Sequence, residues 1–148
     1  MKFLLDVMVG KLVVYLRMCG HDAAYALDRG LEDDDRLHDL ARKEERLLLT
    51  RGRDLAARAE RSLLLTSRDI RGQLRELAAA EVDLALPDEP MRCGRCNGSL
   101  EAVEKDESTP EYAPDPREQQ VWRCIECGQY FWKGSHWKRV EATLSELD

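Results

Sequence analysis

Short apolar runs alternate with helical patterns along the first 86 residues of this 148-residue chain. Between the runs, apolar residues recur every three or four positions, which is the spacing of an amphipathic helix. Strands that alternate with helices in this way are typical of a parallel sheet with helices on both of its faces. We therefore predict an α/β fold whose strands lie at residues 2–5, 23–27, 46–50 and 62–66.

The ends of the predicted helices are marked by residues that favour those positions. Gly20 follows the first helical pattern, and glycine is common just beyond a helix C-terminus. The acidic run 32–35 favours the start of the second helix, because negative charge stabilises a helix N-terminus. A short third helix is expected over 55–60, and Asp69 is suited to cap the fourth.

The character of the sequence changes after residue 86. The residues PDEP at 87–90 interrupt the pattern, and prolines placed in this way are typical of a linker. Residues 91–148 hold most of the aromatic residues, and the polar stretch 106–120 contains several prolines and is predicted to be a loop. We therefore predict two domains, 1–86 and 91–148, joined by the linker 87–90.

Four of the five cysteines form two C-x-x-C pairs in the second domain. Such pairs in a cytosolic protein indicate metal binding, and four thiolates suit a closed, tetrahedral, structural zinc site. The alternatives are two redox dithiols or four free thiols. A domain of this size has a small core, so we expect it to need the metal to fold. The predicted ligands are Cys93, Cys96, Cys124 and Cys127, which leaves Cys19 as a buried apolar residue.

The chain has a formal net charge of −6 and no apolar run near the roughly 20 residues that a membrane helix needs. Its N-terminus also lacks the pattern of a signal peptide. These features predict a soluble cytoplasmic protein that does not contact a membrane. The acidic balance excludes a basic footprint over the whole chain, but nucleic-acid binding depends on local patches.

One such local patch lies at 121–140, where four basic residues are opposed by a single acid. Aromatic residues are interleaved with these cations, an arrangement that can stack bases and hold phosphates. The alternative is that the aromatic residues pack the ribbon core and the cations are merely solvated. The candidate RNA contacts are Arg123, Trp132, Lys133, His136, Trp137 and Lys138.

Asp6, Asp28, Asp54 and Asp69 each follow the end of a predicted strand. Ligands of open parallel sheets bind at this edge, and clustered carboxylates are tolerated mainly by holding a divalent cation. Oxygen ligands favour Mg²⁺ or Mn²⁺, which can activate water against a phosphodiester. Asp28 can equally cap a turn and Asp69 a helix, whereas Asp6 interrupts an apolar stretch where an unpaired charge is costly.

Three stretches are distinctive when they are taken together. They are MKFLLD at 1–6 with GKL at 10–12, LLLTR at 47–51 with SRD at 67–69, and the cysteine pairs with YFWKGSHW at 130–137. These stretches resemble the Mut7-C family of PIN-like ribonucleases over nearly the whole chain. The resemblance implies a PIN-like parallel sheet with helices on both faces, a C-terminal zinc ribbon and metal-dependent cleavage of RNA.

The resemblance also assigns roles to individual acids. Asp6 matches the acid after the first strand, and Asp69 matches the acid after the fourth. An aspartate usually follows LLTR directly in the family, whereas Gly52 stands at that position here, so Asp54 would substitute through a shifted loop. Asp34 or Asp35 is a candidate for a further acid from the start of the second helix.

Three hypotheses about function follow from these features. The first is an Mg²⁺- or Mn²⁺-dependent endoribonuclease whose catalytic metal ligands are Asp6, Asp54 and Asp69. The second is a non-catalytic protein that binds RNA or the ribosome through the ribbon and has a degenerate nuclease site. The third is a zinc-stabilised module for protein interaction. PIN-like domains often dimerise, so a homodimer is compatible with each hypothesis.

Overall fold

A four-stranded parallel sheet forms the centre of the first part of the chain. In the computed structural model, which describes residues 1–147, the second and fourth strands end two residues earlier than predicted. Every strand pairs in parallel with its neighbour, which confirms the predicted sheet. The strands are β1 (Lys2–Leu5), β2 (Asp22–Tyr25), β3 (Leu47–Thr50) and β4 (Ser62–Leu64), in the order β2-β1-β3-β4.

Each strand is followed by a helix, as the sequence pattern predicts. The carboxylates of Asp33 and Asp69 accept hydrogen bonds from the N–H groups of Asp35 and Gly72, so these two aspartates begin their helices. The acidic run 32–35 therefore acts as a helix start. The elements are the 3₁₀ turns η1 (Val7–Val9) and η2 (Leu27–Arg29) and the helices α1 (Lys11–Met18), α2 (Asp34–Lys43), α3 (Arg53–Arg58) and α4 (Ile70–Ala79).

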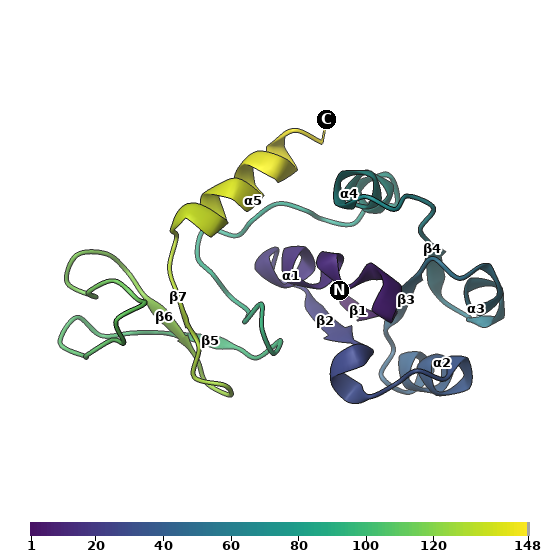
Figure 1. The fold of residues 1–148 in the computed structure, drawn as a ribbon, viewed down its shortest axis with the longest axis horizontal. Coiled ribbons are helices and arrows are strands. Elements are labelled where there is room, and N and C mark those ends of the chain that lie inside the picture. Colours follow the sequence, from purple (N-terminus) through teal and green to yellow (C-terminus); the bar gives the residue numbers. More distant parts are fainter. Residues whose placement is uncertain (148) are drawn as a thin grey trace.

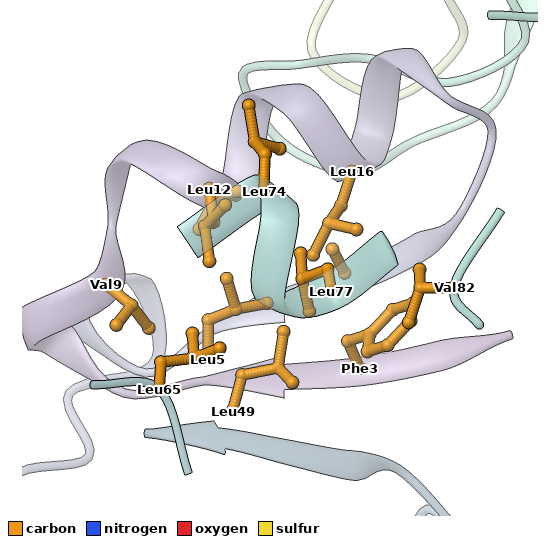
Figure 2. Close-up of a cluster of buried hydrophobic side chains, with 12 residues drawn as sticks. Phe3, Leu5, Val9, Leu12, Leu16, Leu49, Leu65, Leu74, Leu77 and Val82 are labelled. Carbon is orange, nitrogen blue, oxygen red and sulfur yellow. The ribbon is translucent and has the colours of Figure 1, made fainter. Parts of the chain in front are cut away.

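Two hydrophobic clusters hold the helices on opposite faces of this sheet. On one face, Leu12 of α1 and Leu77 of α4 belong to a cluster with Leu5 (Figure 2). On the other face, Leu37 of α2 packs in a cluster with Leu4. Successive residues of a strand point to opposite faces, which is why Leu4 and Leu5 separate in this way. The predicted α/β fold with helices on both faces is confirmed.

The connections from β1 and β3 lead to opposite sides of the sheet. From β1 the chain crosses through α1 to β2 on one side, and it then returns past β1 to β3 and β4 on the other. In open α/β sheets, such a reversal leaves a crevice outside the carboxyl ends of the two strands, and ligands bind there. The fold therefore places the segments after Leu5 and Thr50 at the expected ligand site.

A second, antiparallel sheet forms the ribbon in the later part of the chain. Its strands are β5 (Leu100–Ala102), β6 (Trp122–Cys124) and β7 (Tyr130–Phe131), in that order. Residues 106–120, between β5 and β6, form no helix or strand, which confirms the predicted loop. Val103, Val121 and Trp122 are buried and supply the small core of the ribbon.

The last helix, α5 (Ser135–Ser145), is not among the elements predicted from the sequence. It starts beside β7 and runs back toward α4 (Figure 1). Leu144 packs against the hydrophobic cluster under α1 and α4, and Arg71 of α4 forms an ion pair with Glu146. The helix therefore joins the ribbon to the helices of the parallel sheet. Within residues 1–147, no helix is both long enough and apolar enough to cross a membrane.

Hydrogen bonds join the first cysteine pair to the edge strand β2. The side chain of Asn97 accepts a hydrogen bond from the Ala23 N–H at 3.0 Å and donates one to the Asp22 carboxylate at 2.7 Å. Buried Arg17 of α1 donates to the carbonyl oxygens of Ala23 at 2.9 Å and Gly94 at 3.0 Å. The ribbon thus packs directly on the edge of the parallel sheet.

Candidate functional site

The four cysteines of the C-x-x-C pairs meet at one point of the ribbon. Their sulfur atoms all lie within 4.8 Å of one another, and the Sγ atoms of Cys93 and Cys127 are 3.7 Å apart. The Sγ atoms of Cys96 and Cys124 are 3.5 Å apart. A zinc tetrahedron with Zn–S bonds of about 2.3 Å has sulfur atoms about 3.8 Å apart. The cluster therefore fits a structural metal such as zinc, as the sequence predicts.

The two cysteine pairs have the same backbone geometry. The first sulfur of each pair, in Cys93 or Cys124, accepts hydrogen bonds from the N–H groups two and three residues further on. The residue after each pair, Asn97 or Gly128, has a positive φ of 75° or 80°, which closes the turn. A Cβ atom at Gly98 would lie 2.8 Å from the Cys124 sulfur, so only glycine fits there without a shift.

Burial and hydrogen bonding shift the pKa values of two thiols of the cluster, Cys93 and Cys124, in opposite directions. Burial raises the pKa of Cys93 to about 12. Burial also opposes ionisation of Cys124, but N–H donors from the backbone of Cys127 and Glu126 stabilise its thiolate, and its pKa falls to about 7. Metals bind the thiolate form, so metal binding at this cluster releases protons.

Asp6 stands at the carboxyl end of β1, where the connections of the sheet reverse. Its Oδ1 atom accepts a hydrogen bond from the Val7 N–H at 2.7 Å, and its Oδ2 atom accepts one from the Thr50 hydroxyl at 2.8 Å. Thr50 is fully buried at the end of β3 and also accepts a hydrogen bond from the Gly52 N–H at 2.9 Å. The half-buried carboxylate of Asp6 is therefore held in one orientation by the neighbouring strand.

The two other proposed metal ligands follow β3 and β4 at the same edge of the sheet. Asp54 is exposed in the first turn of α3, and Asp69 is exposed and caps α4. Within residues 1–147, the cysteines form the one group of three or more His, Cys, Asp or Glu side chains close enough to share a metal ion. The structure thus brings the four cysteines together and does not gather Asp6, Asp54 and Asp69 as ligands of one ion.

The remaining candidate acids, Asp28, Asp34 and Asp35, have other surroundings. Asp28 lies in η2 with its Oδ2 atom 3.8 Å from a guanidinium nitrogen of Arg17. Asp35 pairs with Arg58 of α3, and Asp34 is exposed at the start of α2. Asp28 therefore lies in a turn, and the run 32–35 starts a helix. Both are structural roles, which the sequence allows in place of a role as metal ligands.

Two further candidates at this edge, Thr50 and Arg51, are not identified from the sequence. Thr50 orients the Asp6 carboxylate through its hydroxyl group. The Nε atom of Arg51 is buried and has no hydrogen-bond partner in the described part of the chain. An unpaired buried donor costs about 1–3 kcal/mol, a cost that a bound anion would remove. Both residues lie in the LLLTR stretch at the end of β3. Their position at the carboxyl end of a predicted strand is the signal by which the sequence could have identified them as site residues.

The six candidate RNA contacts of the ribbon differ in their exposure and in whether their charge is already paired. Arg123 is bound to Glu101 and lies 3.6 Å from Glu107, so its charge is already compensated. The Nζ atom of Lys133 lies 5.5 Å from the ring centre of Trp137, which is buried. The others are the half-buried Trp132 and the exposed His136 and Lys138.

The cysteine cluster is tested by removing one ligand. We expect the wild-type protein to hold one zinc ion per chain and Cys124→Ser to lose it, because a serine hydroxyl is a poor zinc ligand. Cys19→Ser is the matched control, since Cys19 lies at the end of α1, outside the cluster, and this variant should keep its zinc. Plasma mass spectrometry of dialysed protein measures the ratio, and equal zinc in both variants would contradict the assignment.

Comparison with known families identifies one that spans both parts of the molecule. A family profile described as "Mut7-C RNAse domain" matches residues 1–144, which include the parallel sheet and the cysteine cluster. Neither the curated proteins nor the solved structures contain a significant match. The profile match confirms the resemblance that the sequence motifs indicate. The chain therefore belongs to the Mut7-C RNase domain family.

Proposed function

We propose that this protein is a metal-dependent endoribonuclease in which Asp6 is the central catalytic residue. The observation that carries the proposal is the position of Asp6 between β1 and β3, where open α/β sheets bind their ligands. Membership of an RNase family supports RNA as the substrate. A carboxylate that is already held in place suits this role, because it needs little reorganisation when the substrate binds.

Mg²⁺ or Mn²⁺ is the cofactor that suits these oxygen atoms. Mg²⁺ usually keeps several waters and is bound by one or two carboxylates together with phosphates of the substrate. Asp6 supplies a fixed carboxylate, and the exposed Asp54 and Asp69 are the proposed further ligands. A site that takes ligands from its substrate does not need three carboxylates gathered in advance. The cation, when bound, supplies a Lewis acid toward the phosphate oxygens.

Two neighbours of Asp6 are proposed to support it. Thr50 is a positioning residue, because its hydroxyl donates to Asp6 Oδ2. Each carboxylate oxygen of Asp6 accepts one hydrogen bond here and has a second lone pair available for a cation. Arg51 is proposed to bind a phosphate oxygen through its Nε–H, which has no partner within residues 1–147. Thr50 is the last residue of β3, which borders the crevice, and Arg51 follows it directly.

The ribbon is proposed to bind RNA and to depend on structural zinc. Four thiolate ligands leave no open position on the metal, so the zinc stabilises the ribbon and takes no part in hydrolysis. The exposed Lys133 and Lys138 give this region a local positive charge that suits RNA phosphates. Trp132 and His136, in the same segment, have rings on which bases can stack.

A non-catalytic RNA-binding protein is the second candidate function. Gly52 stands where the family usually has an acid, and Asp6, Asp54 and Asp69 are not gathered as a ligand group within the described residues. A nuclease site that has lost a ligand would leave the ribbon as the RNA-binding element. Binding of RNA without cleavage in any divalent metal would identify this function.

The first test removes the charge of the central acid. We expect Asp6→Asn to lower RNA cleavage by roughly 100-fold or more, because the neutral amide is a weak cation ligand and stabilises no positive charge. Asp88→Asn removes an exposed acid of the predicted linker and should cleave as the wild type does. The assay uses end-labelled single-stranded and structured RNA with Mg²⁺ or Mn²⁺. Unchanged cleavage by Asp6→Asn would exclude Asp6 from the site.

The second test restores the acid that the family usually has. Gly52 has a φ of −83°, and a Cβ atom there would lie 3.4 Å from Thr50 Oγ1, so a side chain fits. We expect Gly52→Asp to lower the Mn²⁺ concentration that gives half-maximal cleavage by roughly tenfold, because an added carboxylate strengthens a hard-cation site. Gly52→Asn is the matched uncharged control. Equal metal dependence in the two variants would show that position 52 does not contribute a ligand.

A further inference from the structure

We propose that a cavity between α1 and the ribbon binds one unpaired base of an RNA strand. The identity of the ligand as RNA rests on the proposed function. The cavity has a volume of about 240 Å³, and its walls come from α1, the segment before the first cysteine pair, β7 and the start of α5. Pockets for drug-sized ligands are larger, at roughly 300–1,000 Å³. This cavity is therefore of a size for a single planar ring system.

The walls of the cavity are mostly apolar and aromatic. Val14 and Met18 line it from α1, and Tyr130, Trp132 and Trp137 line it from the ribbon. Unpaired bases are commonly bound by stacking on aromatic faces, because every base has a π surface. These walls therefore supply the kind of surface on which a base stacks.

Close packing fixes the position of the Trp132 ring. A Cβ atom on Gly134 would lie 2.5 Å from Trp132 Nε1, so the indole packs on bare backbone. On another side, the Tyr112 ring centre lies 6.2 Å from the Trp132 ring centre. A ring that is held in place loses little freedom when a base stacks on it, which favours binding.

The charge of the cavity suits a nucleic acid. None of the residues that line it is an aspartate or a glutamate, although the chain as a whole has a net charge of −6. Arg92 is part of its wall, and Lys133 lies beside it, over the Trp137 ring. A base that enters the cavity would therefore have cations near the phosphates on either side of it.

Polar groups that can read a base edge are also present. The side chains of Trp132, Ser135 and His136 belong to the wall of the cavity. The indole N–H is a donor, and the hydroxyl and imidazole can each donate or accept. Single-stranded RNA is read by such bonds to the edges of bases that are stacked on aromatic rings.

The cavity lies away from the carboxylate edge of the sheet. Helix α1 leads from the carboxyl end of β1, next to Asp6, toward the start of β2. Val14 lies in the middle of α1 and Met18 is its last residue, and a helix of this length spans about 12 Å. The bound base is therefore not the one beside the cleaved bond. It belongs to a nucleotide further along the strand, and the cavity positions the RNA relative to Asp6.

The cavity is tested by RNA binding in a buffer without Mg²⁺ or Mn²⁺, where cleavage does not interfere. The full chain with its zinc is titrated into labelled hexauridylate, hexacytidylate and hexaadenylate, and into an abasic strand of the same length. We expect at least one hexamer to bind more tightly than the abasic strand. Trp132→Ala should raise the Kd of that hexamer by roughly tenfold and leave abasic binding unchanged, because it removes a stacking surface and no charge.

A second variant closes the cavity and keeps every aromatic residue. Val14→Phe places a ring in the cavity from α1 and should weaken the same hexamer as Trp132→Ala does. Met8→Phe is the control, since Met8 is exposed before α1 and outside the cavity, and it should bind as the wild type does. Zinc content and circular dichroism verify that each variant is folded.

The outcomes separate this proposal from the proposed function. Equal binding of hexamers and abasic strand by the wild type, or unchanged hexamer binding by both cavity variants, overturns the base site even if the protein cleaves RNA. Base-dependent binding that both variants weaken supports the base site even if no cleavage is found with any metal. In that second case the nuclease proposal alone fails.

Discussion

The side-chain amide of Asn97 connects the cysteine cluster to the parallel sheet, and the arrangement of the two parts depends on it. Its oxygen accepts a hydrogen bond from the Ala23 N–H, and its nitrogen donates to Asp22, so both groups lie on the edge strand β2. Asn97 directly follows Cys96, and its positive φ belongs to the turn that places the sulfur atoms. The geometry that holds a metal is therefore the same geometry that holds the edge of the sheet. An exposed strand edge invites wrong pairing, and this turn covers it.

The contact between Asn97 and β2 is connected to both proposed sites, the Asp6 carboxylate and the cavity beside α1. Buried Arg46 donates to Asp22 and to the Phe3 carbonyl, so the network continues from the edge strand to the first residues of β1. The Asp6 carboxylate follows the same strand. On the ribbon side, the cavity exists only while α1 lies against the ribbon, because Val14 and Met18 form one wall and the aromatic residues the other. A metal that stabilises the turn thus stabilises the place where we propose that a base binds.

The sequence predicts the features that depend on local patterns, and it does not predict those that depend on contacts across the chain. The four parallel strands, the first four helices and the clustering of the four cysteines follow from spacing and residue type, and all are confirmed. Asn97 and Ala23 are 74 positions apart, so nothing in either segment indicates that they meet. The sequence allows Asp69 to be a helix cap, a metal ligand or both. The hydrogen bond that it accepts from the Gly72 N–H confirms the cap, and its role as a ligand stays a proposal. The role of Thr50 depends on the order of the strands, which brings it beside Asp6. Helix α5 is not predicted, although Trp137, Val140 and Leu144 have helical spacing, because the aromatic residues at 130–137 favour an interpretation as ribbon.

Amide hydrogen exchange of Ala23 with and without metal tests the central claim most directly. If the cysteine cluster holds the edge of the sheet, removal of zinc should speed exchange at Ala23 by roughly tenfold or more, because its N–H loses the Asn97 acceptor. The N–H of Leu48, in the interior strand β3, donates to Arg61 and should keep its protection. Exchange at Ala23 that does not change when zinc is removed would show that the sheet and the metal centre are independent, and would contradict this account.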